Sequence, residues 1–250
     1  MFCLRDRPLS EEHVIPKWAQ QYIKDPQNGP GTHTRRLYEA GNSDATFSRS
    51  YSGYPATQVT RCACQECNNG WMASLEGTVK PLLVPMIQGQ STTLDPPAQT
   101  LITSWLVKTA LVAGATLPDL VPREFYASSF SGSLGTLPTL AWLAQAPYEQ
   151  HHQQDFRPIR THWPADPPPP APNSYSAMVV IGQWVGLVVS WRDVEPPIER
   201  VEERFGPALT SIWPTTLPSA EWPPSGGALD FAHLDALADT VAPLSSSRSA

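Results

Sequence analysis

The clearest pattern of apolar positions spans residues 95–114, where apolar residues recur three and four positions apart. This spacing places them on one face of an α-helix and predicts that the face is buried. Asp95 can cap this helix and the prolines after it suit the first turn, whereas Gly114 is suited to end it. The buried stripe consists of Leu101, Ile102, Trp105, Thr109, Val112 and Ala113.

A second helix is expected over residues 69–79. Four apolar residues of this segment fall on one side, namely Trp71, Met72, Leu75 and Val79. Pro81 is expected to end the helix, because proline in a helix interior removes a hydrogen bond. Directly before the helix, alternation over residues 58–62 predicts a short strand.

Apolar runs in the second half of the chain predict strands. Residues 178–181 and 184–191 are separated by Gly182-Gln183, a spacing typical of a β-hairpin. Residues 139–146 form a further strand candidate, and residues 229–239 predict a short helix.

Polar segments punctuated by glycine or proline predict loops. Residues 25–54 are rich in Gly, Ser, Asn and Thr without a long period, so we expect a loop with at most short strands. Residues 166–172 hold five prolines and predict an extended linker. Proline makes up 28 of the 250 residues, about twice its usual share of ~5 %, so much of the chain is expected to be irregular.

Charge is distributed unevenly along the chain, whose net charge is −6. Residues 1–80 contain nine Lys/Arg and eight Asp/Glu, whereas the remainder contains eight and fifteen, so the first third is the better candidate for contact with DNA. No stretch approaches the ~20 apolar residues of a membrane span, and the N-terminus has no apolar region typical of a signal peptide. We therefore expect a cytoplasmic protein with no membrane partner.

Cys64-Gln65-Glu66-Cys67 is a C-x-x-C, a spacing at which two thiolates bind one metal ion from a tight turn. A predicted strand precedes it and a predicted helix follows it. Clustered cysteines in a reducing compartment indicate a metal site rather than a disulfide framework. The alternative is a pair of thiols packed in a core. We expect Cys64 and Cys67 to bind a structural Zn²⁺.

A structural zinc usually needs four protein ligands, and Cys3 is the natural third. The partner of Cys3 in a second knuckle would precede Met1, which leaves the fourth ligand open. Three alternatives remain for the fourth ligand. It is encoded upstream of Met1, it is missing, or it is Cys62, which shares a strand face with Cys64. The alternative for Cys62 is a residue packed in a small core.

Two motifs together resemble the HNH endonucleases. The first is Phe2-Cys3 followed by LSEEHVIP at residues 9–16, and the second is the C-x-x-C followed by NNGWM at residues 68–72. The chain is similar to the group common in bacteria and their phages that carries EHVIPKW and CxxCNxGWM motifs. The resemblance covers roughly residues 1–80.

The resemblance implies a finger with a structural Zn²⁺ held by two knuckles and a separate catalytic Mg²⁺ or Mn²⁺. It assigns His13 as the general base that activates water against a DNA phosphodiester and Glu12 as the acidic residue beside the catalytic ion. Asn68 matches the final residue of the HNH motif, a His or Asn on the metal side. A neutral imidazole accepts a proton near neutral pH, and a divalent ion on oxygen ligands offsets phosphate charge. The middle Asn of the HNH motif cannot be assigned from the sequence, because no recognisable pattern surrounds it; Asn42 is one option.

Together these features predict an α+β protein. An N-terminal treble-clef or ββα-metal zinc finger is expected over residues 1–90, and an accessory α+β domain with one long helix and an antiparallel hairpin sheet over residues 91–222. Residues 223–250 are expected to form a Pro/Gly/Ser-rich, partly disordered tail. The expected function is metal-dependent hydrolysis of DNA. The alternative is a catalytically inactive, zinc-stabilised module that binds nucleic acid or protein.

Overall fold

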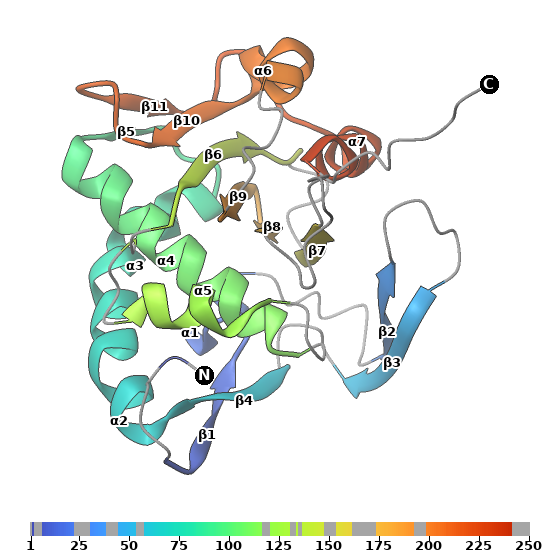
Figure 1. The fold of residues 1–250 in the computed structure, drawn as a ribbon. Coiled ribbons are helices and arrows are strands. Elements are labelled where there is room, and N and C mark those ends of the chain that lie inside the picture. The colour runs from blue at the N-terminus through green and yellow to red at the C-terminus, as the bar shows by residue number, and fades with distance from the viewer. Residues whose placement is uncertain are drawn as a thin grey trace.

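A computed structural model describes most of the chain. The described residues are 2, 7–22, 31–38, 45–53, 58–116, 121–130, 134, 137–147, 154–161, 174–192 and 199–241. A five-stranded sheet occupies one end of the molecule and the N-terminal strand pair the other (Figure 1). Helix α4 (Pro96–Gly114) packs against strands of both.

The N-terminal unit is an antiparallel strand pair followed directly by helices. Its elements are β1 (Leu9–His13), α1 (Lys17–Gln20), β4 (Val59–Cys64), α2 (Gln65–Cys67), η2 (Asn68–Met72) and α3 (Ala73–Ile87). The register sets Leu9 opposite Cys64 and His13 opposite Val59, with a β-bulge between Ser10 and Glu11. The strand expected over residues 58–62 and the helical segment after it are confirmed.

The expected end of that helix at Pro81 is wrong, because α3 continues through Pro81 and Pro85 to Ile87. Each proline costs a helix interior about 3 kcal/mol, since it removes a hydrogen bond and its ring clashes with the preceding turn. Against this, four apolar side chains of α3 are buried, each contributing about 1.5–3 kcal/mol. They are Val79, Leu83, Met86 and Ile87. Packing therefore outweighs the local signal.

Strands β2 (Gly31–Tyr38) and β3 (Ala45–Gly53) pair antiparallel along their length. The expectation of a loop with at most short strands over residues 25–54 is therefore wrong. Both strands contain Thr and Tyr, β3 also contains Phe, and Thr and aromatic residues favour extended backbone. Pairing of the two strands satisfies their backbone N–H donors and C=O acceptors, and the polar composition of the segment does not reveal this pairing.

The large sheet is antiparallel throughout, in the order β10-β6-β9-β8-β7. Its strands are β6 (Thr139–Gln145), β7 (Gln154–Thr161), β8 (Ser174–Ile181), β9 (Trp184–Trp191) and β10 (Thr210–Trp213). The predicted strand at 139–146 and the predicted hairpin, whose turn has Gly182 at φ +58°, are confirmed. The proline-rich stretch 166–172 lies outside the described residues.

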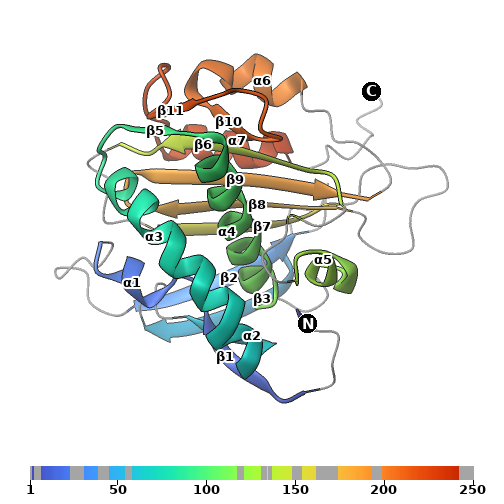
Figure 2. The same ribbon diagram turned by 90° about the vertical axis from the view of Figure 1, so that its left-hand side faces the viewer.

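Helix α4 crosses one face of this sheet (Figure 2). Its predicted start is confirmed, because the Asp95 side chain accepts a hydrogen bond from the N–H of Ala98 at 2.8 Å. Gly186 of β9 leaves room for the Trp184 ring and for the helix, since a Cβ there would clash with that ring and lie 3.0 Å from the Leu106 side chain of α4. The long helix and the antiparallel hairpin sheet confirm the α+β class.

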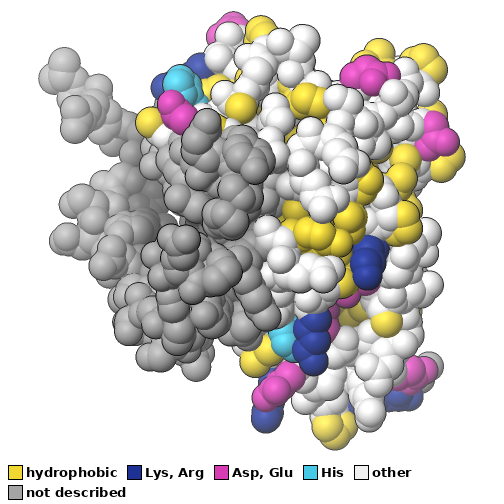
Figure 3. Space-filling model, turned by 180° about the vertical axis from the view of Figure 1, so that it is seen from behind, with side chains coloured by type: hydrophobic (Ala, Val, Ile, Leu, Met, Phe, Trp, Pro, Cys, Tyr) yellow, Lys and Arg dark blue, Asp and Glu magenta, His cyan; other side chains and the backbone are white. Residues whose placement is uncertain are grey.

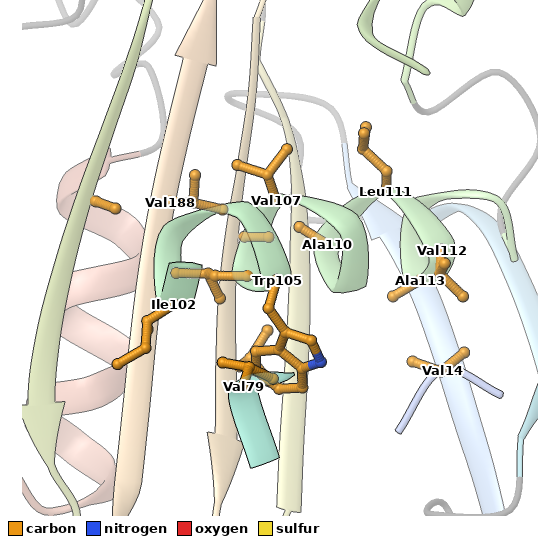
Figure 4. Close-up of a cluster of buried hydrophobic side chains, with 14 of the residues drawn as sticks. Val14, Val79, Ile102, Trp105, Val107, Ala110, Leu111, Val112, Ala113 and Val188 are labelled. Atoms are coloured by element: carbon orange, nitrogen blue, oxygen red, sulfur yellow. The ribbon is translucent and has the colours of Figure 1, made fainter. Parts of the chain in front are cut away.

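One of two apolar clusters among the described residues joins the two ends of the molecule. Figure 4 shows Val79 of α3 beside the Trp105 ring and Val14 beside Val112 and Ala113 of α4. The Trp105 ring also lies edge-on to Trp184 of the sheet, with centroids 5.5 Å apart. This core includes residues from both sides of the expected boundary at 90/91, which stays a prediction.

The remaining elements pack around the large sheet. They are β5 (Thr92–Leu94), β11 (Ala220–Trp222), α5 (Arg123–Ser128), α6 (Glu199–Phe205), the short helix η5 (Gly206–Ala208) and α7 (Phe231–Val241). β5 pairs with β11, and α6 and α7 bury Phe205 and Leu234 against the face of the sheet opposite α4. The helix expected near residues 229–239 is confirmed as α7. The chain beyond residue 241 lies outside the described part.

Candidate functional site

His13 is the last residue of β1, at the point where the chain leaves the strand pair. Its side chain is half-buried, whereas Val14 after it is buried and donates its N–H to the carbonyl O of Gln58 at 2.9 Å. The strand therefore ends with an imidazole at the border between the core and solvent, where a water molecule or a substrate can reach it.

Partial burial lowers the pKa of His13 below its ordinary value of 6.5, and exposed Lys17 at the start of α1 lowers it further. The carboxylates of Glu12, Glu76 and Glu11 act in the opposite direction without reversing the shift. The neutral imidazole is therefore the main form near neutral pH, and a neutral imidazole can accept a proton.

Glu12, directly before His13, points into the protein. Its Oε1 accepts a hydrogen bond at 2.5 Å from the Nζ of Lys108, which belongs to α4. The same ammonium donates to Oε1 of Glu76 on α3 at 2.7 Å. The exposed fractions of the three side chains are 1 % for Lys108, 10 % for Glu12 and 20 % for Glu76. Three elements thus meet at one buried ammonium.

Burial alone would lower the pKa of Lys108, but the carboxylates of Glu76 and Glu12 outweigh burial and raise it. The lysine is therefore charged. Neither Lys108 nor Glu76 was expected at the site. The sequence holds one signal, because Lys108 is the single charged residue within the otherwise apolar and polar-neutral span of α4.

Asn68 binds the backbone of β1. Its Nδ2 donates to the carbonyl O of Glu11 at 2.8 Å and to Oγ of Ser10 at 3.3 Å. Ser10 in turn donates from Oγ to the carbonyl O of Ala63 at 2.9 Å. The amide therefore ties the start of the helical segment to the bulge in β1, two residues before His13.

The cysteines surround the turn between β4 and α2. Cys64 is the last residue of β4 and Cys67 the last of α2, and both side chains are buried, which is compatible with the predicted zinc knuckle. Burial and the nearby Glu12 carboxylate raise the pKa of Cys62 to about 12, although Lys108 acts against this rise. Cys62 is therefore a protonated thiol near neutral pH.

Cys3 lies outside the described residues, as does Asn42. Phe2, the residue before Cys3, donates its N–H to the carbonyl O of Cys62 at 3.4 Å. Within the described part of the chain, no three His, Cys, Asp or Glu side chains are grouped so that they could hold a metal ion. Zinc binding by Cys3, Cys64, Cys67 or Cys62 stays a prediction.

The side chains around Glu12 do not fit a divalent ion as they are arranged. Mg²⁺ requires several oxygen ligands around one point. Glu12 and Glu76 instead converge on the Lys108 ammonium, and the hydrogen bonds of Asn68 go to β1. The assignment of Glu12 and Asn68 to a catalytic ion stays a prediction, and Oε1 of Glu12 is occupied by the Lys108 ammonium.

Among the described residues, no helix is both long and apolar enough to cross a lipid bilayer. The chain matches no protein-family model, no curated protein and no solved structure.

Proposed function

We propose that this protein is an HNH-type endonuclease that hydrolyses DNA phosphodiester bonds with His13 as the general base. The observation that carries the proposal is the position of His13: a half-buried imidazole, kept neutral, at the end of a strand whose partner strand leads into a helix. The two motifs of the resemblance supply the chemical class.

In the proposed reaction, the neutral imidazole of His13 accepts a proton from a water molecule that attacks the phosphorus atom. The P–O bond to the leaving sugar oxygen breaks, and that oxygen takes up a proton from solvent. Exposed Lys17 lies close enough to lower the pKa of His13, so its ammonium can offset charge on a phosphate bound at the same place. Asn68 holds the bulge of β1 and thereby the direction in which His13 projects.

The proposal includes a structural Zn²⁺ on Cys64 and Cys67 with Cys3 as third ligand. It also includes a catalytic Mg²⁺ or Mn²⁺, as the resemblance implies, but no step is assigned to that ion because the side chains around Glu12 do not fit it. Metal analysis of the purified protein tests the zinc. About one equivalent that falls when Cys64→Ser is introduced would support the knuckle.

The catalytic proposal is tested with supercoiled plasmid in Mg²⁺, in Mn²⁺ and in EDTA. His13→Ala is expected to reduce the cleavage rate by about 10²–10⁴-fold, the usual contribution of a general base. His233→Ala is the matched control, because His233 is an exposed histidine on α7 and should leave the rate unchanged. Equal cleavage by the wild type and His13→Ala would refute the assignment.

The second candidate is a zinc-stabilised binding module without catalysis. Two observations favour it: Glu12 is ion-paired with Lys108, and on the face in Figure 3 basic, acidic and apolar side chains are interspersed rather than gathered into a basic patch. Stoichiometric zinc in a protein that cleaves no DNA with either divalent ion would favour this candidate.

A further inference from the structure

Lys108 has a side chain that is 1 % exposed, on a helix whose other residues are uncharged. A buried ammonium is stable only with anionic partners that satisfy its donors. Both of its partners come from other elements: Glu12 from β1, 96 positions earlier in the sequence, and Glu76 from α3, 32 positions earlier.

The contacts of Lys108 have the arrangement of a small cation site. Two carboxylate oxygens face one positive centre at 2.5 and 2.7 Å, of which the first lies within and the second just beyond the ~2.0–2.6 Å of divalent ions bound to oxygen ligands. The cluster carries one positive and two negative charges. The ammonium thus offsets part of the carboxylate charge that a divalent ion would otherwise offset.

We propose that Lys108 is the resident cation of the Glu12–Glu76 carboxylate pair and holds β1, α3 and α4 together in place of a divalent ion. Glu12 and Glu76 are committed to this ammonium, and any divalent ion that the protein uses binds through other groups.

Mn²⁺ binding to the full-length protein without DNA tests the proposal. Free Mn²⁺ is followed by its electron paramagnetic resonance signal, and the melting temperature is measured in parallel. The variants are Glu12→Gln, Glu76→Gln, Lys108→Met and the double variant Glu12→Gln/Lys108→Met. Lys80→Met is the matched control, since Lys80 is an exposed lysine on α3.

In the wild type, Mn²⁺ binding is expected to stay the same within about twofold when Glu12 or Glu76 is changed to Gln, because neither carboxylate is available to the ion. Lys108→Met is expected to bind Mn²⁺ at least about tenfold more tightly than the wild type, because two carboxylates without their ammonium attract a divalent ion. Adding Glu12→Gln should abolish that gain. Lys80→Met should behave as the wild type.

Loss of wild-type Mn²⁺ binding in Glu12→Gln or Glu76→Gln would overturn the proposal, because the ion would then displace Lys108 from its carboxylates. A folded Lys108→Met protein without any gain in Mn²⁺ affinity would overturn it as well. If Lys108→Met does not fold, the comparison of the wild type with the two Gln variants decides. None of these measurements uses DNA cleavage, so an inactive protein leaves the test intact.

Discussion

Removal of the Lys108 charge should destabilise the protein strongly. Lys108→Met keeps the length and apolar stem of the side chain but leaves Glu12 and Glu76 facing each other without a counter-ion. Breaking a buried ion pair by removing one partner costs about 3–5 kcal/mol. This is a large part of the about 5–15 kcal/mol by which domains are stable. At about 2–4 °C per kcal/mol for a protein of this size, it lowers the melting temperature by roughly 6–20 °C.

A further variant separates the effect of the unpaired carboxylates from the effect of altered packing. The triple variant Glu12→Gln/Glu76→Gln/Lys108→Met removes all three charges and keeps side chains of similar volume. Neutral replacements of whole buried ion pairs are often neutral or stabilising, so the triple variant should be more stable than Lys108→Met alone, within about 1–2 kcal/mol of the wild type.

Urea unfolding at pH 7, followed by tryptophan fluorescence, measures these free energies. The exposed Lys80→Met variant should differ from the wild type by no more than about 0.5 kcal/mol. Two results would refute the reasoning. One is a Lys108→Met protein as stable as the Lys80→Met control, and the other is simple additivity of the three single substitutions, which would show that the charges do not interact.

Three further predictions concern other parts of the molecule. Asn68→Ala should cost about 1–2 kcal/mol in urea unfolding and slow plasmid cleavage, because the amide no longer holds β1, whereas exposed Asn69→Ala should change neither. Trp105→Ala should cost about 3–5 kcal/mol in the same unfolding assay, since the ring is fully buried between α3 and the sheet. Hydrogen bonds from the backbone N–H and the ring of His233 hold the pKa of Asp230 below 3.8 in the folded protein. The ionised Asp230 therefore stabilises the fold above pH 3.8, and this stabilisation is lost as pH falls through the lower folded-state pKa. The free energy of unfolding of Asp230→Asn should lack this acid dependence.

Local patterns in the sequence predicted the elements whose signals are strong. The cap at Asp95 and the apolar runs on either side of Gly182 depend on residues close together in sequence, and both are confirmed. The stripe around Trp105 is buried apart from half-buried Leu101, but burial extends to all residues 102–114 of α4 rather than to one face. Two predictions failed where contacts distant in sequence decide. Helix α3 crosses Pro81 because its buried face packs on α4, and β2 pairs with β3 although neither strand has a strong apolar pattern.

The candidate site could be predicted only in part for the same reason. His13 and Asn68 belong to short motifs, so they could be singled out from residue type and spacing. Lys108 and Glu76 become part of the site only because α4 and α3 pack beside β1, and no spacing along the chain encodes that meeting. A single lysine in an uncharged helix was the available signal.

The origin of Lys108 in α4 has a consequence for how the protein acquires its site during folding. The ion pair of Glu12 forms only with a residue 96 positions further along the chain, and β1 pairs with β4 only after the intervening β2–β3 hairpin has been synthesised. Closing such long loops lowers chain entropy before any contact compensates for it, which slows folding. A polypeptide that ended at residue 90 would contain His13, Glu12 and Asn68 but would carry two uncompensated carboxylates, so the ion-paired arrangement around Glu12 should form only after α4 has been synthesised and docked.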